Sequence, residues 1–176
     1  MRKHIVWIFL ALLLFTTQLV TATGNYNRTA AINYADQYCA TPNPAYFCSG
    51  WNDCTNFTSQ VLHAGGLPEI GWWQWDRDHW FFHGCGWFRH SNTWSVPSWF
   101  DDHAWRTSSR YQVRSISNLE SGDVILFQWP GASDWGHAAV YIENNLRSQH
   151  TPNRCRVWIW YNVPSGTVVR GWHVRW

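Results

Sequence analysis

Apolar residues recur along this chain with a helical period first and with a strand period later. In residues 28–38 the apolar side chains lie three or four positions apart, so they line one face of a helix: Ala31, Tyr34, Ala35 and Tyr38. Asn27 precedes this segment and can cap the predicted helix. Residues 39–52 contain two Pro and one Gly, which indicates a loop.

A second helix is predicted from Asp53 or Cys54 to Ala64. Asn52 or Asp53 can cap it, and the pair Gly65-Gly66 ends it. The residues that share one face of this helix are Cys54, Phe57 and Val61, with Leu62 close to them. Residues 68–110 show poor periodicity and many aromatic rings, and they predict short helices and long loops.

After Ser121 the pattern changes to that of strands. Strands are predicted over 124–127, 137–142, 146–151, 156–161 and 167–174, with a hairpin turn at 143–145. Alternation along the second of these places His137, Ala139 and Tyr141 on one face and the residues between them on the core face. Helices that precede an antiparallel sheet in sequence predict an α+β fold.

The first residues have the pattern of a secretory signal. A basic start is followed by an apolar run over 5–20 and by small residues up to Ala22, so residues 1–22 are interpreted as a signal peptide. The apolar run is shorter than the ~20 residues of a spanning helix, although an uncleaved N-terminal anchor is the alternative. Residues 23–176 are then one secreted domain, with no later stretch that spans a membrane.

The charge and the tryptophan content narrow the choice of partners. The formal net charge is +2, and Arg2 and Lys3 of the signal account for it, so nothing indicates a nucleic-acid partner. The chain has 16 Trp, of which only Trp7 lies in the signal. One core does not hold so many indoles, so several should be exposed and available to bind sugars, peptides or a membrane interface.

The cysteine count of five is odd, which leaves one thiol without a partner in an oxidising compartment. Cys54 differs from the others in its local context, so two bridges are expected among Cys39, Cys48, Cys85 and Cys155. Pairing Cys39 with Cys48 and Cys85 with Cys155 is one connectivity, but four cysteines allow three. The alternative is five inert buried thiols.

Cys54 is the candidate nucleophile, because it stands at the start of a predicted helix. The first amide N–H groups of a helix have no partner within it, and its positive dipole end favours a thiolate. The same N–H groups can stabilise an oxyanion. The expectation from sequence is therefore a Cys54 thiolate near neutral pH.

A thiol nucleophile needs a histidine, and His137 is the candidate among nine. It opens a strand after Gly136, with small neighbours that leave the imidazole accessible. A third polar group should fix its tautomer. His150, across the hairpin turn, is the first candidate for this role, and Asn153 is the second.

Several segments of the chain resemble the putative amidase domain family in the same order. Residues 53–60 (Asp-Cys-Thr-Asn-Phe-Thr-Ser-Gln) and 62–66 resemble its nucleophile helix, and its later blocks are matched by 122–125, 136–137 and 148–151. That family is similar to NlpC-type cell-wall peptidases. The resemblance implies a papain-like α+β fold, a triad of Cys54, His137 and His150, and an oxyanion tyrosine whose nearest counterpart is Tyr46. It also implies a peptide or peptidoglycan-like substrate and no cofactor.

Two other functions compete with this interpretation. A zinc site is one, because His79 and His83 are four residues apart and Cys85 and His90 are near, but no Glu lies between the two histidines to act as a base. A Trp-rich module that binds glycan or peptide without catalysis is the other. A Ser-His-Asp hydrolase has no support, because the chain has no Gly-x-Ser-x-Gly motif.

Overall fold

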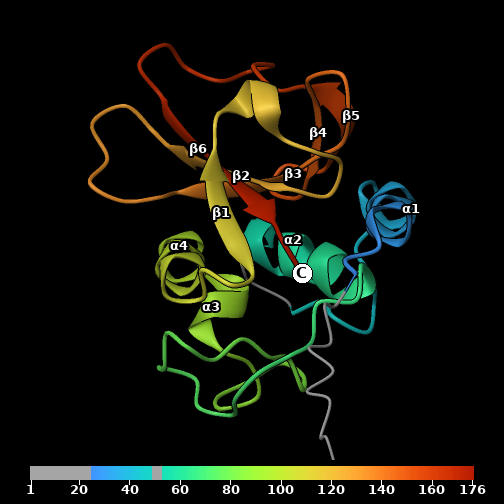
Figure 1. The fold of residues 1–176 in the computed structure, drawn as a ribbon, viewed down its shortest axis with the longest axis vertical. Coiled ribbons are helices and arrows are strands. Elements are labelled where there is room, and N and C mark those ends of the chain that lie inside the picture. The colour runs from blue at the N-terminus through green and yellow to red at the C-terminus, as the bar shows by residue number, and fades with distance from the viewer. Residues whose placement is uncertain (1–24, 49–52) are drawn as a thin grey trace, which may run out of the picture.

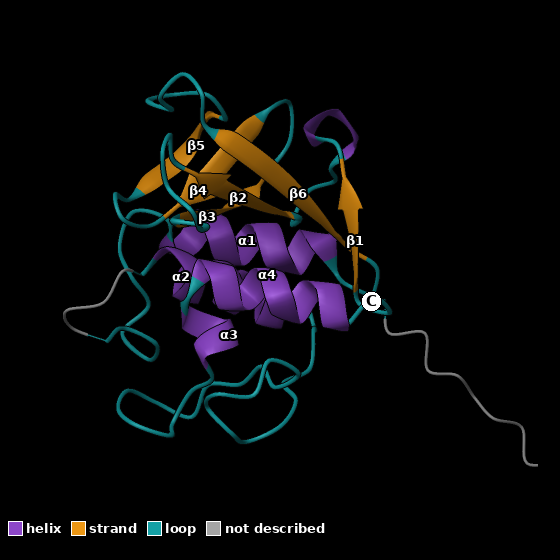
Figure 2. Cartoon of the chain, turned by 90° about the vertical axis from the view of Figure 1, so that its left-hand side faces the viewer, coloured by secondary structure: helices purple, strands orange, loops and turns teal. Residues whose placement is uncertain are grey.

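A layer of three helices lies against one face of a six-stranded antiparallel sheet, and a fourth, short helix packs on the far side of this layer (Figure 1, Figure 2). The structure is a computed structural model, and it describes residues 25–48 and 53–176. The predicted signal over 1–22 and the alternative cap Asn52 lie outside the described residues. Within the described part no helix is both long enough and apolar enough to cross a bilayer.

The two long helices predicted from the apolar spacing are confirmed as α1 (Arg28–Tyr38) and α2 (Cys54–Ala64). The side chain of Asn27 caps α1 by accepting a hydrogen bond from the N–H of Ala30 at 2.9 Å. Asp53 stands at the cap position of α2, but its carboxylate makes no such bond. Two further helices follow, α3 (Asn92–Ser95) and α4 (Pro97–Arg106).

The α+β prediction is confirmed by a sheet whose strand order is β1-β6-β2-β3-β4-β5. Its strands are β1 (Tyr111–Arg114), β2 (Val124–Gln128), β3 (His137–Tyr141), β4 (Leu146–Gln149), β5 (Arg154–Trp158) and β6 (Val168–Val174). The predicted strand over 156–161 therefore begins and ends earlier than expected. β1 and a short 3₁₀ helix (Ile116–Asn118) were not predicted.

The two faces of the sheet bury different apolar clusters. On the helix side, Phe57 and Val61 of α2 pack in one cluster with Ala138 and Val140 of β3. On the other side, Ile125, Phe127, Ala139 and Tyr141 pack with Leu119 and Ile159. The predicted alternation of β3 is thus confirmed, and it puts the side chain of His137 on the face away from α2, near Phe127.

The tryptophans divide between the core and the surface, as expected from their number. Trp80, Trp94 and Trp172 are fully buried in the core. Trp72, Trp73, Trp75 and Trp87 are exposed and contact one another edge to face in the loops between α2 and α3.

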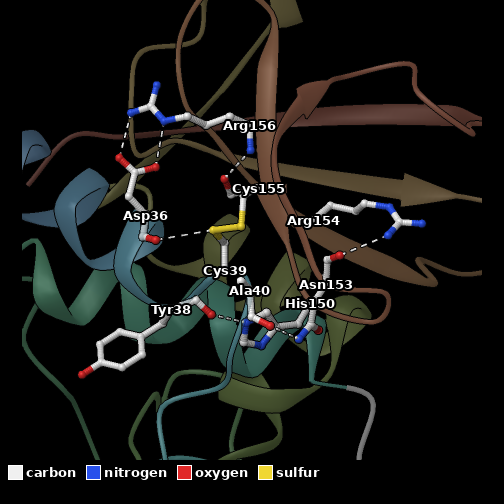
Figure 3. Close-up of a disulfide and its surroundings, with 10 residues drawn as sticks. Asp36, Tyr38, Cys39, Ala40, His150, Asn153, Arg154, Cys155 and Arg156 are labelled. Atoms are coloured by element: carbon white, nitrogen blue, oxygen red, sulfur yellow. Dashed lines mark hydrogen bonds and ion pairs between the residues drawn. A yellow bond between two sulfur atoms is a disulfide. The ribbon is translucent and has the colours of Figure 1, made fainter.

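Two disulfides use the four predicted cysteines, and Cys54 is the free cysteine among the described residues. The pairs are Cys39–Cys155, which joins the end of α1 to β5 (Figure 3), and Cys48–Cys85. The suggested pairing of Cys39 with Cys48 was wrong, because the fold brings together segments that are distant in sequence. The Cα atoms of the two observed pairs are 5.3 Å and 5.5 Å apart, which suits a disulfide.

Candidate functional site

Cys54 is the first residue of α2 and is only 2% exposed. Burial raises the pKa of its thiol, and the nearby Asp53 carboxylate raises it further. The N–H groups of Ala138 and Thr55 and the Thr55 hydroxyl, 3.7 Å from the sulfur, act in the opposite direction but do not outweigh burial. The expectation of a thiolate near neutral pH was therefore wrong: desolvation exceeds the effect of the helix start, and Cys54 is a thiol.

The start of α2 is fixed by contacts with the segment that follows β4. The N–H of Asp53 donates to the Thr151 hydroxyl at 3.0 Å, and the Asp53 carboxylate accepts from the Asn56 side chain at 2.6 Å. The same carboxylate is hydrogen-bonded to Nδ1 of His150, 2.5 Å away, and both side chains are buried. These contacts set the position of the residue next to them, Cys54.

His137 opens β3 and is 5% exposed. Its ring lies beside those of Phe127 and Trp129, with ring centroids 5.8 Å and 5.9 Å away. Burial lowers the pKa of His137 to about 4, a nearby Gln149 amide raises it, and the charge of Arg147 lowers it. At neutral pH the imidazole is therefore uncharged and able to accept a proton.

Cys54 is linked to His137 by a contact with the backbone of β3 rather than with the His137 side chain. The N–H of Ala138 that lies at the Cys54 sulfur belongs to the peptide bond that begins at His137. No hydrogen bond joins the two side chains among the residues described here. Nε2 of His137 is buried and has no hydrogen-bond partner, so this nitrogen is available for a proton transfer.

His150 does not contact His137 by a hydrogen bond. Its Nδ1 faces Asp53, its Nε2 lies 2.7 Å from the carbonyl oxygen of Tyr38, and its ring stacks on Phe57 at 4.1 Å (Figure 3 shows the Tyr38 contact). The second candidate, Asn153, donates instead to the carbonyl oxygen of Ala40 at 3.0 Å. The structure thus shows neither residue hydrogen-bonded to His137, and these contacts give no support to the prediction that one of them orients its imidazole.

The register of the sheet gives the physical reason. Val140 pairs with Ser148 and Tyr141 with Arg147, whereas His150 follows the end of β4 and its ring stacks on Phe57 of α2. Because side chains alternate along a strand, Arg147 and Gln149 of β4 share a face with His137. Gln149 is 4% exposed, and its Oε1 is buried without a hydrogen-bond partner. Gln149 was not predicted from the sequence, although it immediately precedes His150.

Tyr46 lies in the loop before α2, in the helix-side cluster. Its ring packs against those of Phe82 and Trp94, and its carbonyl oxygen accepts from the Asn56 side chain at 3.0 Å. Burial raises the pKa of its hydroxyl. Among the described residues, no hydrogen bond joins Tyr46 to Cys54. The proposed role of Tyr46 in stabilising an oxyanion therefore stays a prediction.

A small hollow of about 80 Å³ is bordered by His137, Gln149 and Arg147, with Trp129 and Tyr161 at its walls. Three larger hollows lie elsewhere. One, of about 610 Å³, is lined by Arg28 and Glu120 among others, and the second, of about 480 Å³, is lined by the exposed indoles of Trp75 and Trp87. The third, of about 260 Å³, is lined by Tyr46 and Phe82 among others. Of these four hollows the small one includes the candidate base His137, and Cys54 lines none of them.

One of the residues considered as a zinc ligand in the Trp-rich region, Cys85, cannot bind a metal. Cys85 is bonded to Cys48 and has no thiolate to offer. Nδ1 of His79 accepts a hydrogen bond from the N–H of Trp73 at 2.9 Å. Among the described residues, no group of three metal-binding side chains gathers in one place.

Comparison with known proteins gives a family and two relatives. The family described as a putative amidase domain matches residues 25–164. The uncharacterized protein YhbB of Bacillus subtilis is 30% identical over 148 residues, which is 76% of this chain and 44% of that protein. The uncharacterized protein YjcM of the same organism is 39% identical over 64 residues, 36% of this chain and 16% of that protein. The chain thus spans less than half the length of these relatives, and no solved structure matches it.

Proposed function

Because the chain belongs to the family described as a putative amidase domain, we propose that it hydrolyses an amide bond with Cys54 as nucleophile and His137 as base. The observation that carries this proposal is the position of the free Cys54 at the start of α2. Its sulfur lies against the peptide bond that joins His137 to Ala138. The uncharged imidazole of His137 supplies the proton acceptor that a buried thiol needs.

The proposed reaction starts from a protonated Cys54 thiol and an uncharged His137 imidazole. His137 takes the proton of the thiol as the sulfur attacks the amide carbonyl, because a raised thiol pKa and a lowered imidazole pKa disfavour a preformed ion pair. The oxyanion forms beside the free N–H groups of the first turn of α2. The imidazolium then protonates the leaving amine, and water hydrolyses the thioester with His137 again as base. The His137 side chain lies on the face of the sheet away from α2, so it must turn toward Cys54 when substrate binds. Catalytic contacts that are loose in a free enzyme can tighten in this way with substrate bound.

Gln149 takes the place in the proposal that sequence analysis gave to His150. Its side-chain nitrogen donates to the carbonyl oxygen of Pro152 at 3.2 Å, which leaves the amide oxygen as the atom to face the imidazole. An amide oxygen accepts from an imidazole N–H and so selects one tautomer of His137. His150 is proposed instead to position Cys54, through its hydrogen bond with Asp53.

The location and the substrate class are also proposals. Two disulfides suit an extracellular protein, because thiols of cytosolic proteins are kept reduced. Together with the predicted signal, they support secretion and a substrate outside the cell. We take the peptide stems of peptidoglycan as the first substrate to test.

A Trp-rich binding module without catalysis is the second candidate function. The exposed rings of Trp72, Trp73, Trp75 and Trp87 form one continuous cluster beside the hollow of about 480 Å³. Exposed aromatic clusters of this kind mark binding surfaces. This function assigns no role to the free thiol of Cys54.

Digestion of purified peptidoglycan, with mass analysis of the released fragments, separates the two functions. The wild-type protein should release fragments with a new amine and a new carboxylate, and Cys54→Ala should release none. The matched control is Trp87→Ala, which alters the exposed cluster and leaves Cys54 in place. If Cys54→Ala released the same fragments as the wild type, the cysteine mechanism would be refuted.

A further inference from the structure

Arg147 of β4 is buried on the same face of the sheet as His137. It is 4% exposed, and its guanidinium lies over the ring of Phe127, 4.7 Å from the centroid. One nitrogen, Nη2, donates to the carbonyl oxygen of Tyr161 at 2.8 Å. The other two, Nε and Nη1, are buried and have no hydrogen-bond partner.

No carboxylate of the described residues forms an ion pair with Arg147. Burial lowers the pKa of Arg147 to about 10, so the guanidinium still carries its charge at neutral pH. A buried cation with unused donors is costly for a fold, and natural proteins pair such groups. The fold therefore holds, beside His137, a charge that no carboxylate of the described residues balances.

The side chain that carries the unpaired donors borders a hollow on the face of the sheet away from α2. Arg147 borders the hollow of about 80 Å³ together with His137 and Gln149, and its charge is close enough to lower the pKa of His137. The other charged residue at this hollow is Arg154, and no acidic residue lines it. The hollow is thus small, positively charged and next to the proposed base.

We propose that Arg147 binds a carboxylate of the substrate, so that the amide bond that is hydrolysed lies next to a free carboxylate. The planar guanidinium suits a planar carboxylate, and a small hollow has room for this group and the carbon that bears it rather than for a larger anion. A peptide that ends in a free carboxylate has this chemistry. The placement next to catalysis rests on the proposed function, whereas the binding itself does not.

The bound carboxylate would also assist His137. It offsets the charge of Arg147, which otherwise disfavours the imidazolium that forms when the thiol proton is taken. A substrate with the carboxylate therefore makes His137 a better base than a neutral substrate does. The site couples recognition of the substrate to catalysis through one arginine.

Binding is tested without turnover in the Cys54→Ala protein. The probes are an acetylated alanine dipeptide with a free carboxylate and the same dipeptide as its C-terminal amide, each titrated by calorimetry. The acid should bind about 10- to 100-fold more tightly than the amide. Arg147→Gln in the same background should abolish this preference, and Arg106→Gln, which replaces an exposed arginine of α4, should keep it.

A second measurement leaves Arg147 unchanged, in case Arg147→Gln does not fold. A saturating concentration of the acid should raise the melting temperature of the Cys54→Ala protein, because a ligand of the native state stabilises it, and the amide should raise it much less. Equal binding of acid and amide, or a preference that survives in Arg147→Gln, would overturn the proposal. If the preference holds while peptidoglycan is not cleaved, Arg147 is a carboxylate site and the proposed hydrolysis is what fails.

Discussion

Two buried, uncharged histidines, His103 and His137, should make the folded protein less stable in acid. His103 lies away from the candidate site, so its contribution can be tested separately. His103 lies on α4 and is fully buried. Its Nδ1–H donates to the carbonyl oxygen of Arg77 at 2.9 Å, and its Nε2 has no hydrogen-bond partner. Burial lowers the pKa of His103 to about 4, and the charge of Arg110 contributes to the lowering.

The magnitude follows from the difference between folded and unfolded pKa values. The unfolded chain takes up a proton on His103 near pH 6.5, whereas the folded chain does so only near pH 4. Between these values the unfolded state binds more protons, so the free energy of unfolding falls as the pH falls. From pH 7.5 to pH 4.5 the loss is about 2 to 3 kcal/mol for one such histidine. The same reasoning applies to His137, whose pKa is also lowered to about 4.

Urea denaturation at these two pH values, without reductant, measures this loss directly. His103→Gln keeps a donor for the Arg77 carbonyl but has no group that titrates in this range. The variant should lose about 2 to 3 kcal/mol less than the wild type between pH 7.5 and pH 4.5, whatever its stability at either pH. An unchanged loss in His103→Gln would refute the assignment of a buried, uncharged His103.

Three further predictions concern the site and its supports. Gln149→Ala should lower kcat about 10- to 100-fold with little change in KM, because a misaligned imidazole transfers protons poorly; a change confined to KM would contradict this role. Asp53→Ala should cost about 1–3 kcal/mol in urea denaturation, since it leaves Nδ1 of the buried His150 without its hydrogen-bond partner, and a cost near zero would contradict the importance of this contact. Replacing Cys39 and Cys155 by Ser should cost about 2–5 kcal/mol, and non-reducing peptide mapping that finds another pairing would contradict the bridge.

Much of the fold could be predicted from local pattern. The apolar spacing in 28–38 and 54–64 and the alternation in 137–141 correspond to α1, α2 and β3, because helix and strand periods fix which side chains meet a core. β1 (Tyr111–Arg114) was missed because it is short and only its first residue is buried, so alternation is hardly expressed. The disulfide pairing was missed because Cys39 and Cys155 are 116 residues apart and meet only in the folded chain.

The candidate site shows where sequence alone does not suffice. Cys54 was correctly singled out as the free cysteine, but burial decides the state of its thiol, and burial is a property of the fold. The exchange of His150 for Gln149 has a similar cause. One position along β4 moves a side chain to the other face, and the hairpin length alone does not fix the register. Arg147 carried no signal in the sequence, because an unpaired buried cation is visible only in three dimensions.

The central claim is that Cys54 is the nucleophile of an amide hydrolase, and alkylation during turnover tests it most directly. The wild-type protein is treated with iodoacetamide without reductant at a series of pH values, while release of peptidoglycan fragments and the site of labelling are followed together. Loss of hydrolysis should match the modification of Cys54, and labelling should quicken as the pH rises above neutral, because burial raises the pKa of this thiol. Hydrolysis that continues with Cys54 fully modified would contradict the claim.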